Sequence, residues 1–297
     1  MSEQRNSFLR SAFILVERDK KSFSRSTYLN YRTALRAFAR FGGQEYGIND
    51  ISVALMTAFQ RWLAEHNVGR NTSSCYMRSL RSLYRKLGGE KEPFRDVYTG
   101  MERTEKRALT LEEIRRLRNL QLKYKSKMDI TRDLFLFSFY SLGMPFVDLA
   151  FLRRANIRGD FIVYRRHKTG QKIKVPLETC MVEIIEKYTE TGNRHLFPII
   201  TEQNLDKQLE QYKVKLGNYN RMLKKLAVQA GISRNLSSYV VRHSWASAAY
   251  EGNVDLPVIS KALGHTNART TQIYISEIND ERLSEASHKL LSDFLSR

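Results

Sequence analysis

The sequence contains little cysteine and no long apolar segment. Its 297 residues include only Cys75 and Cys180, too few for a disulfide framework or a cysteine-based zinc site. No stretch approaches the roughly 18 consecutive apolar residues of a membrane-spanning helix, and the residues after Met1 lack a signal peptide's apolar region. No His, Asp and Glu cluster has metal-ligand spacing, and no Gly-rich phosphate loop occurs. We expect a reduced, cytoplasmic protein with no metal, no cofactor and no membrane partner.

Positive charge is what the chain has in excess. It contains 50 Lys and Arg against 31 Asp and Glu, which gives a formal net charge of +19 and a pI near 9.9. The excess is shared by both halves of the chain and is not confined to a tail. A polyanion is the expected partner, with nucleic acid favoured over an anionic membrane.

The N-terminal hundred residues carry the spacing of amphipathic helices. Apolar positions predict helices around 26–41, over 53–65, and from an N-cap at Asn71 or Thr72 to the glycines at 88–89. Two of these helices also have an arginine face without acids, formed by Arg32, Arg36 and Arg40 and by Arg78, Arg81 and Arg85. One such face is often only solvated surface, but two favour contact with DNA phosphates.

The rest of the chain predicts a second domain. Residues 101–109 are polar and aperiodic, as in a linker. Thr110-Leu111-Glu112-Glu113 matches a capping box that begins a helix. Leu134 to Tyr140 is apolar on nearly every side, which predicts a buried central helix. The expected domains are therefore 1–100 and 110–297.

One β element stands out in the second domain. Phe161–Tyr164 and Ile173–Val175 favour strands, and Gly170 between them permits a hairpin turn. Helices are expected from about Glu178 onward, the last over 279–295. The predicted fold is mainly α with a small β-hairpin or sheet.

The most informative segment runs from Tyr239 to Tyr274. Arg242 and His243 are followed by Leu263-Gly264-His265, and Tyr274 comes nine residues after that histidine. In this order and spacing, the residues resemble the C-terminal signature of the tyrosine recombinase (phage integrase) family. The resemblance covers the whole chain and implies a helical, SAM-like core-binding domain, a linker and a mixed α/β catalytic domain.

The resemblance implies a role for each motif residue. A phenolic hydroxyl can attack phosphorus and keep the bond energy as a phosphotyrosine, which is the role of Tyr274. Arg242 offers a planar fork for two phosphate oxygens. His265 can donate to the phosphate or exchange a proton with the tyrosine. Lys168, near the hairpin tip, matches the family's general-acid lysine, and Lys172 is the alternative.

Two positions depart from the family pattern. Tyr239 stands where a histidine is usual, three residues before the second arginine; tyrosine can bond a phosphate but is a poor base near neutral pH. Pro145 stands where the first catalytic arginine is expected, and a proline cannot bind a phosphate. Arg153, Arg154 and Arg166 are the open candidates for the missing cation.

Three further residues are candidates for support. Asp148 matches the family's acidic residue, which orients other groups, although a helix N-cap is an equally good interpretation. His243 is expected to point elsewhere than Arg242 on its helix. Trp245 either contacts the phosphate or packs in the core.

The sequence predicts a site-specific recombinase of duplex DNA that forms a 3′-phosphotyrosyl intermediate and a Holliday junction. Four protomers would act on two specific sites at the bacterial nucleoid, with accessory DNA-bending proteins as possible further partners. The segment Gly143–Asp148 resembles the corresponding segment of mobile-element recombinases and invertases. Whether the outcome is inversion, excision or integration stays open. The alternatives are a DNA-binding relative that no longer cuts and an enzyme like the type IB topoisomerases.

Overall fold

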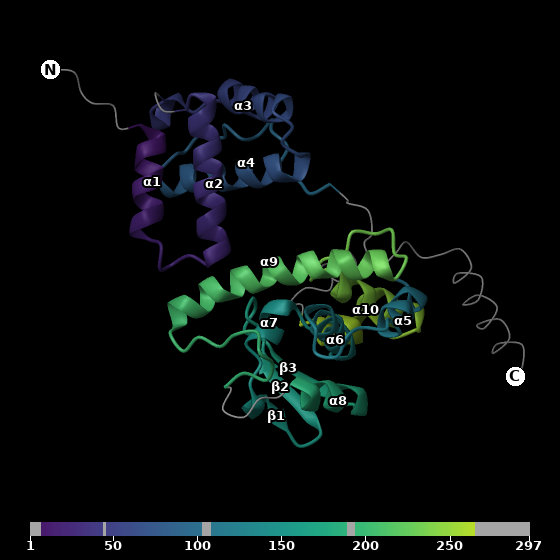
Figure 1. Ribbon diagram of the computed structural model, residues 1–297. Coiled ribbons are helices and arrows are strands. Elements are labelled where there is room, and N and C mark those ends of the chain that lie inside the picture. Colours follow the sequence, from purple (N-terminus) through teal and green to yellow (C-terminus); the bar gives the residue numbers. More distant parts are fainter. Residues whose placement is uncertain (1–6, 44–45, 103–107, 189–193, 265–297) are drawn as a thin grey trace, which may run out of the picture. The chain divides into compact units, whose positions relative to one another are not determined.

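The chain divides into two compact units, residues 1–104 and 105–297 (Figure 1). The computed structural model describes residues 7–43, 46–102, 108–188 and 194–264. The boundary between the units falls inside residues 101–109, the segment expected to be a linker. The linker itself stays a prediction, because residues 103–107 lie outside the described ranges. The helix expected over 279–295 also lies outside them.

The described part of the first unit contains four α-helices around an aromatic core. They are α1 (Phe8–Arg18), α2 (Arg25–Phe41), α3 (Val53–Glu65) and α4 (Arg70–Lys86). Helix α2 packs against both α1 and α4. The ring of Phe38 meets those of Phe8 and Phe59 edge-on, at centroid distances of 6.2 and 5.2 Å. The helices predicted from apolar spacing at 26–41 and 53–65 are confirmed.

The start of α4 differs from the prediction. Its N-cap is Gly69, not Asn71 or Thr72. The amide of Asn71 instead bonds the backbone of Glu102, donating to its carbonyl at 3.0 Å and accepting from its N–H at 2.7 Å. Asn71 and Thr72 both lie inside the helix, and the Asn71 side chain, used in this way, does not cap it.

The second unit is mainly helical with a small antiparallel sheet. The helices and strands of its described part are α5 (Leu111–Arg118), α6 (Lys127–Tyr140), α7 (Phe146–Ala150), β1 (Ile157–Arg158), β2 (Phe161–Arg165), β3 (Lys172–Pro176), α8 (Thr179–Tyr188), α9 (Leu205–Gln229), α10 (Val240–Glu251) and α11 (Leu256–Leu263). Strand β2 pairs with both β1 and β3, and Gly170 in the β2–β3 turn has φ +69°. The predicted hairpin is confirmed, whereas β1 was not predicted. None of the helices in the described ranges is long and apolar enough to span a bilayer.

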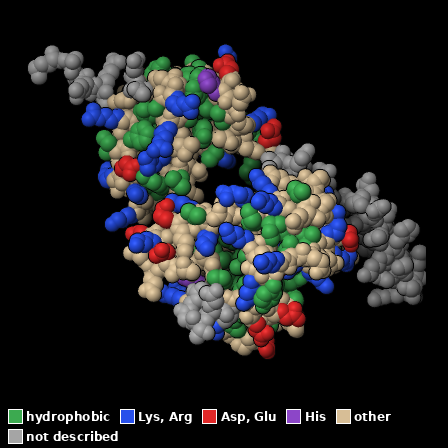
Figure 2. All heavy atoms as spheres, viewed as in Figure 1, with side chains coloured by type: hydrophobic (Ala, Val, Ile, Leu, Met, Phe, Trp, Pro, Cys, Tyr) green, Lys and Arg blue, Asp and Glu red, His purple; other side chains and the backbone are tan. Residues whose placement is uncertain are grey.

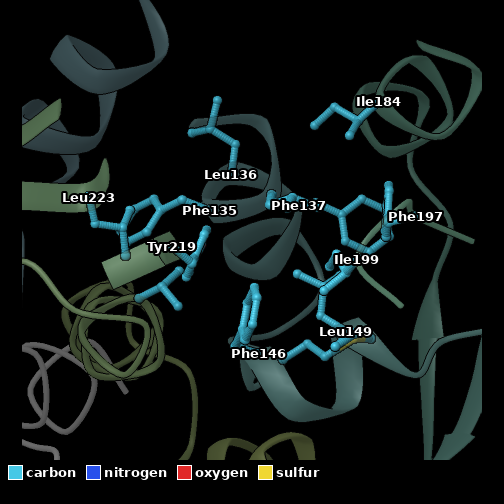
Figure 3. Close-up of a cluster of buried hydrophobic side chains, with 14 of the residues drawn as sticks. Phe135, Leu136, Phe137, Phe146, Leu149, Ile184, Phe197, Ile199, Tyr219 and Leu223 are labelled. Carbon is cyan, nitrogen blue, oxygen red and sulfur yellow. The ribbon is translucent and has the colours of Figure 1, made fainter. Parts of the chain in front are cut away.

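Helix α6 is the centre of this unit and confirms the predicted buried helix. It packs against α5, α8, α9 and α10, and Figure 3 shows its residues Phe135, Leu136 and Phe137 pointing in different directions into the core. The ring of Phe146, at the start of α7, stacks on Tyr219 of α9 at 4.3 Å. This stacking fixes the start of helix α7 against α9.

The capping box predicted at the start of α5 is confirmed. Oγ1 of Thr110 accepts from the N–H of Glu113 at 3.2 Å, and the Glu113 carboxylate accepts from the N–H of Thr110 at 2.8 Å. The preceding N–H, of Leu109, donates to Oγ of Ser244 in α10 at 2.8 Å. The entry to the second unit is thus bonded directly to the helix that carries Arg242.

A buried ionic cluster joins α8 to α6. Nζ of Lys187 lies 2.7 Å from carboxylate oxygens of both Asp129 and Asp133. Burial raises the pKa of Asp129, but hydrogen bonds from Lys187 and from the backbone N–H of Lys125, together with the charges of Lys187 and Arg132, hold it below its ordinary value. The carboxylate is ionised at neutral pH, and the cluster fixes the helix that follows β3.

Candidate active site

Arg242 lies in the first turn of α10 with only 2% of its surface exposed. Its Nη1 donates to the carbonyl of Gly143 at 3.2 Å, and its Nη2 donates to the carbonyl of Leu263. Gly143 belongs to the loop between α6 and α7, and Leu263 is the last residue of α11. The guanidinium therefore joins three segments that are far apart in the sequence.

The loop between α6 and α7 is shaped to receive α10. Leu142 and Gly143 both have left-handed backbones, with φ +60° and +69°. A Cβ at Gly143 would lie 3.0 Å from Cα of Arg242, so only glycine permits this approach. Ser138 of α6 donates its hydroxyl to the carbonyl of Met144, and its own carbonyl accepts from the N–H of that residue. The central helix therefore sets the position of the loop and, through it, of Arg242.

Arg166 reaches the same carbonyl from the hairpin. It is 7% exposed, and its Nη1 donates to the carbonyl of Leu263 at 2.8 Å. Its Nε lies 2.9 Å from Oδ2 of Asp148, a carboxylate buried in α7. Oδ1 of Asp148 accepts from the backbone N–H of His167 at 2.8 Å. The N-cap interpretation of Asp148 is wrong, because Pro145 is the N-cap of α7 and Asp148 orients the hairpin turn instead.

The turn after α11 packs directly on the hairpin. Gly264 has φ +64°, and a Cβ there would lie 2.9 Å from Cδ1 of Ile173 and 3.3 Å from Cγ of Arg166. Both the backbone conformation and the space therefore require glycine. His265 follows at once, but it lies outside the described residues, as does Tyr274. The placement of these two side chains stays a prediction.

The other predicted site residues differ in exposure. Lys168 is exposed in the hairpin turn. Tyr239, 47% exposed before α10, meets the ring of His243 edge-on at 5.0 Å. Trp245 packs in a small cluster with Ile259 and other apolar residues, which agrees with its core interpretation.

Two of the three open candidates for the missing cation lie on the surface. Arg153 and Arg154 are exposed in the turn after α7, because that helix already ends at Ala150. The N–H of Arg153 donates to Oδ1 of Asn156 at 2.8 Å, and its backbone bridges to that of His195. Within the described ranges, neither arginine side chain forms a hydrogen bond or an ion pair with α10 or α11.

Sequence reasoning missed Tyr164, which lies beneath the site. Ile162, Tyr164 and Arg166 are buried, and the residues between them are more exposed, so the inward alternation of β2 continues into the turn. Burial raises the pKa of Tyr164 far above its ordinary value, Asp148 adds to the rise, and the arginines oppose it. The phenol therefore stays neutral. The alternation of inward and outward residues along this strand could have predicted that both Tyr164 and Arg166 are buried.

The two predicted arginine faces of the first unit are only partly available to a ligand. Arg32 contacts Glu17 at 3.5 Å and donates to Oη of Tyr28 at 2.9 Å, and Arg85 donates to Glu92 at 2.7 Å. The other four have no acidic partner within the described ranges: Arg36, Arg40, Arg78 and Arg81. On the face drawn in Figure 2, Lys and Arg side chains are widespread and acidic ones are fewer. Among the described residues, no His, Cys, Asp and Glu side chains gather as a metal site would require.

Comparison with known proteins assigns the chain to a family. Residues 107–281 match the phage integrase family, and residues 7–86 match the phage integrase SAM-like domain. The chain belongs to the phage integrase family. It is a tyrosine recombinase, an enzyme of DNA strand exchange, as the motif predicted.

Relatives of known name agree with this assignment. The chain is 26% identical over 273 residues to tyrosine recombinase XerA of Thermococcus kodakarensis, covering 91% of each protein. In fold it is similar to the Tn1549 transposon integrase in complex with circular intermediate DNA, with a TM-score of 0.71, 14% identity and coverage of 95% of this chain and 99% of that one. It is also similar to lambda integrase, solved as a tetramer on a Holliday junction, with a TM-score of 0.68, 17% identity and coverage of 91% and 79%. The predicted fold class is confirmed.

The close contact at Gly143 yields a first test. We expect Gly143→Ala to lower the free energy of unfolding by about 2–4 kcal/mol, because the new methyl group adds overpacking against the α10 backbone to positive-φ strain. DNA cleavage should slow as well, since Arg242 moves with α10. Thermal unfolding and cleavage assays measure both effects.

Gly159→Ala is the matched control for this test. Gly159 also has a left-handed backbone, with φ +55°, but no atom lies within 4 Å of the place that a Cβ would occupy. It should lose only about 1 kcal/mol through strain and keep its cleavage rate. Equal losses in the two variants would contradict the role assigned to the Gly143 contact.

Proposed function

We propose that the chain cuts and rejoins duplex DNA at specific sites through a covalent bond between Tyr274 and a 3′ phosphate. The burial of Arg242 against the Leu263–Gly264 turn carries this proposal. It sets a fixed cation beside the segment that continues into His265. The family match, which extends to residue 281, includes the proposed nucleophile.

The proposed reaction is two successive transesterifications. Oη of Tyr274 attacks phosphorus, the bond from phosphorus to the 5′ oxygen breaks, and Lys168 donates a proton to that leaving oxygen. The 5′ hydroxyl of the partner strand then attacks the phosphotyrosine, and the bond from phosphorus to Tyr274 breaks. The number of phosphodiester bonds is conserved, so neither ATP nor a metal is consumed.

The remaining motif residues act on charge and protons. The fork of Arg242 donates to non-bridging oxygens, where negative charge grows in the transition state. His265 exchanges a proton with the Tyr274 hydroxyl. Tyr239 donates a hydrogen bond to the phosphate from the start of α10, and its exposed side chain beside His243 supports this role.

Strand exchange between two sites calls for an assembly. We infer four protomers of this chain on two specific DNA sites, passing through a Holliday junction; the lambda integrase tetramer solved on such a junction supports this. The segment Gly143–Asp148 supports a place among mobile-element recombinases and invertases.

One observation favours a second candidate. Pro145 occupies the position expected for the first catalytic arginine, as a protein that binds DNA without cutting it would tolerate. Such a protein would keep salt-sensitive DNA binding and form no covalent adduct. A topoisomerase-like enzyme would form the adduct and relax a plasmid that lacks a second site.

Covalent trapping separates these functions. We expect the purified protein, mixed with a supercoiled plasmid carrying DNA that flanks its own gene and quenched with detergent, to be bound covalently to a 3′ phosphate. The adduct should vanish in Tyr274→Phe, because a phenyl ring has no nucleophilic oxygen.

Tyr124→Phe is the control, since Tyr124 is an exposed tyrosine in the turn before α6; it should form the adduct normally. Salt-sensitive binding without an adduct, on the plasmid and on nicked suicide duplexes alike, would establish the non-cutting alternative.

The arginine faces predict a difference within one helix. Arg36→Gln should lower the slope of log binding constant against log salt by about 0.9, the value for one lost phosphate contact. Arg32→Gln, one helical turn earlier, should change it little because Glu17 and Tyr28 already hold that side chain. Salt titrations of binding to duplex DNA measure both slopes. A larger change for Arg32 than for Arg36 would show that the stripe contacts DNA differently.

A further inference from the structure

The position at which the family's first catalytic arginine is expected holds Pro145. This residue is the N-cap of α7, and its ring carries no hydrogen-bond donor. Gly143, two residues earlier, accepts from Arg242, so the loop still borders the buried guanidinium. In a chain that cuts DNA with two cations on the scissile phosphate, the second cation comes from another segment.

We propose that Arg166, from the β2–β3 hairpin, binds the scissile phosphate together with Arg242. This inference rests on the proposed recombinase function. Arg166 and Arg242 donate to one and the same atom, the carbonyl oxygen of Leu263. Because each donor lies within hydrogen-bond reach of that oxygen, the two nitrogens are within about 6 Å of each other. A phosphate bound beside the Leu263 carbonyl would lie within reach of both guanidinium groups.

The backbone register brings Arg166 to this position. Arg166 extends the inward face of β2, after the buried Ile162 and Tyr164. Its neighbour Arg165 lies on the outward face, is exposed, and donates to the carbonyl of Gly170 at 3.1 Å. Of two adjacent arginines, only one can therefore reach the site.

Asp148 positions the Arg166 guanidinium from α7. The ion pair with Nε leaves the Nη side directed at the Leu263 carbonyl. Within the described residues Nη2 of Arg166 has no acceptor, so its N–H groups are available to an oxyanion. Helix α7 therefore has no cation at position 145, and its carboxylate at Asp148 holds a cation that comes from the hairpin.

The rival residues do not share this geometry. Arg153 and Arg154 are exposed in the turn after α7, and the backbone of Arg153 is bonded to Asn156 and bridged to His195. Arg166 is buried, ion-paired and hydrogen-bonded to the acceptor of Arg242.

A charge-neutral phosphate tests the proposal. Once the adduct has mapped the cleaved phosphate, suicide duplexes are made with a normal phosphodiester or a methylphosphonate there, in which a methyl group replaces one charged oxygen. Adduct formation is timed for the unmutated chain, Arg166→Ala, Arg165→Ala and Tyr274→Phe.

A phosphate-binding role predicts a change in substrate preference. On the phosphodiester, Arg166→Ala should react about 10²-fold or more slowly. On the methylphosphonate, which has lost the charge that Arg166 would neutralise, it should react as fast as the unmutated chain or faster. Arg165→Ala should match the unmutated chain on both duplexes.

Other outcomes overturn the inference in distinguishable ways. If Arg166→Ala slows both duplexes by the same factor, its role is only to hold the hairpin. If it cuts the phosphodiester at the normal rate, another group supplies the cation. No adduct with the unmutated chain would reject the proposed function and this inference with it. Should Arg166→Ala fail to fold in a thermal melt, Arg166→Lys carries the test, because it keeps the charge and loses the planar fork: a smaller loss, again confined to the phosphodiester, is expected.

Discussion

The site depends on one carbonyl group. The oxygen of Leu263 accepts from two buried arginines, Arg242 of α10 and Arg166 of the hairpin, and so fixes the end of α11 against both. Gly143 and Gly264 make this possible, because a side chain at either position would collide with a neighbouring segment. The contact thus gathers four parts of the chain at the point where the motif continues into His265. Buried donors on a shared acceptor form a rigid arrangement, which is what stabilisation of a phosphoryl transition state requires.

Helix α7 shows how a departure from a family pattern can be accommodated. Pro145 is the N-cap of this helix and stands where an arginine is expected, yet Asp148 within the helix holds Arg166 and the N–H of His167. Asp148 therefore fixes the positions of both the Arg166 guanidinium and the turn that carries Lys168. We propose that Arg166 supplies from the hairpin the positive charge that the family pattern places at position 145. The site is defined by where charges lie, and the order of residues in the chain is secondary.

Much of the fold follows from local patterns. Apolar spacing predicted α2 and α3, the capping box predicted α5, and Gly170 marked the hairpin, because each is governed by neighbouring residues. The start of α4 was missed because Asn71 bonds a residue far along the chain. The choice between Arg153, Arg154 and Arg166 stayed open for the same reason. It depends on how far α7 extends and on which face of β2 packs inward, and tertiary packing settles both.

The central claim is that Arg166 and Arg242 together bind the scissile phosphate. A crystal structure of Tyr274→Phe on duplex DNA containing the mapped cleavage site tests it most directly. We expect Nη atoms of both arginines to lie within hydrogen-bond distance of non-bridging oxygens of that phosphate, with Asp148 still paired to Nε of Arg166. A phosphate contacted by Arg242 and by Arg153 or Arg154, with Arg166 remote from it, would contradict the account.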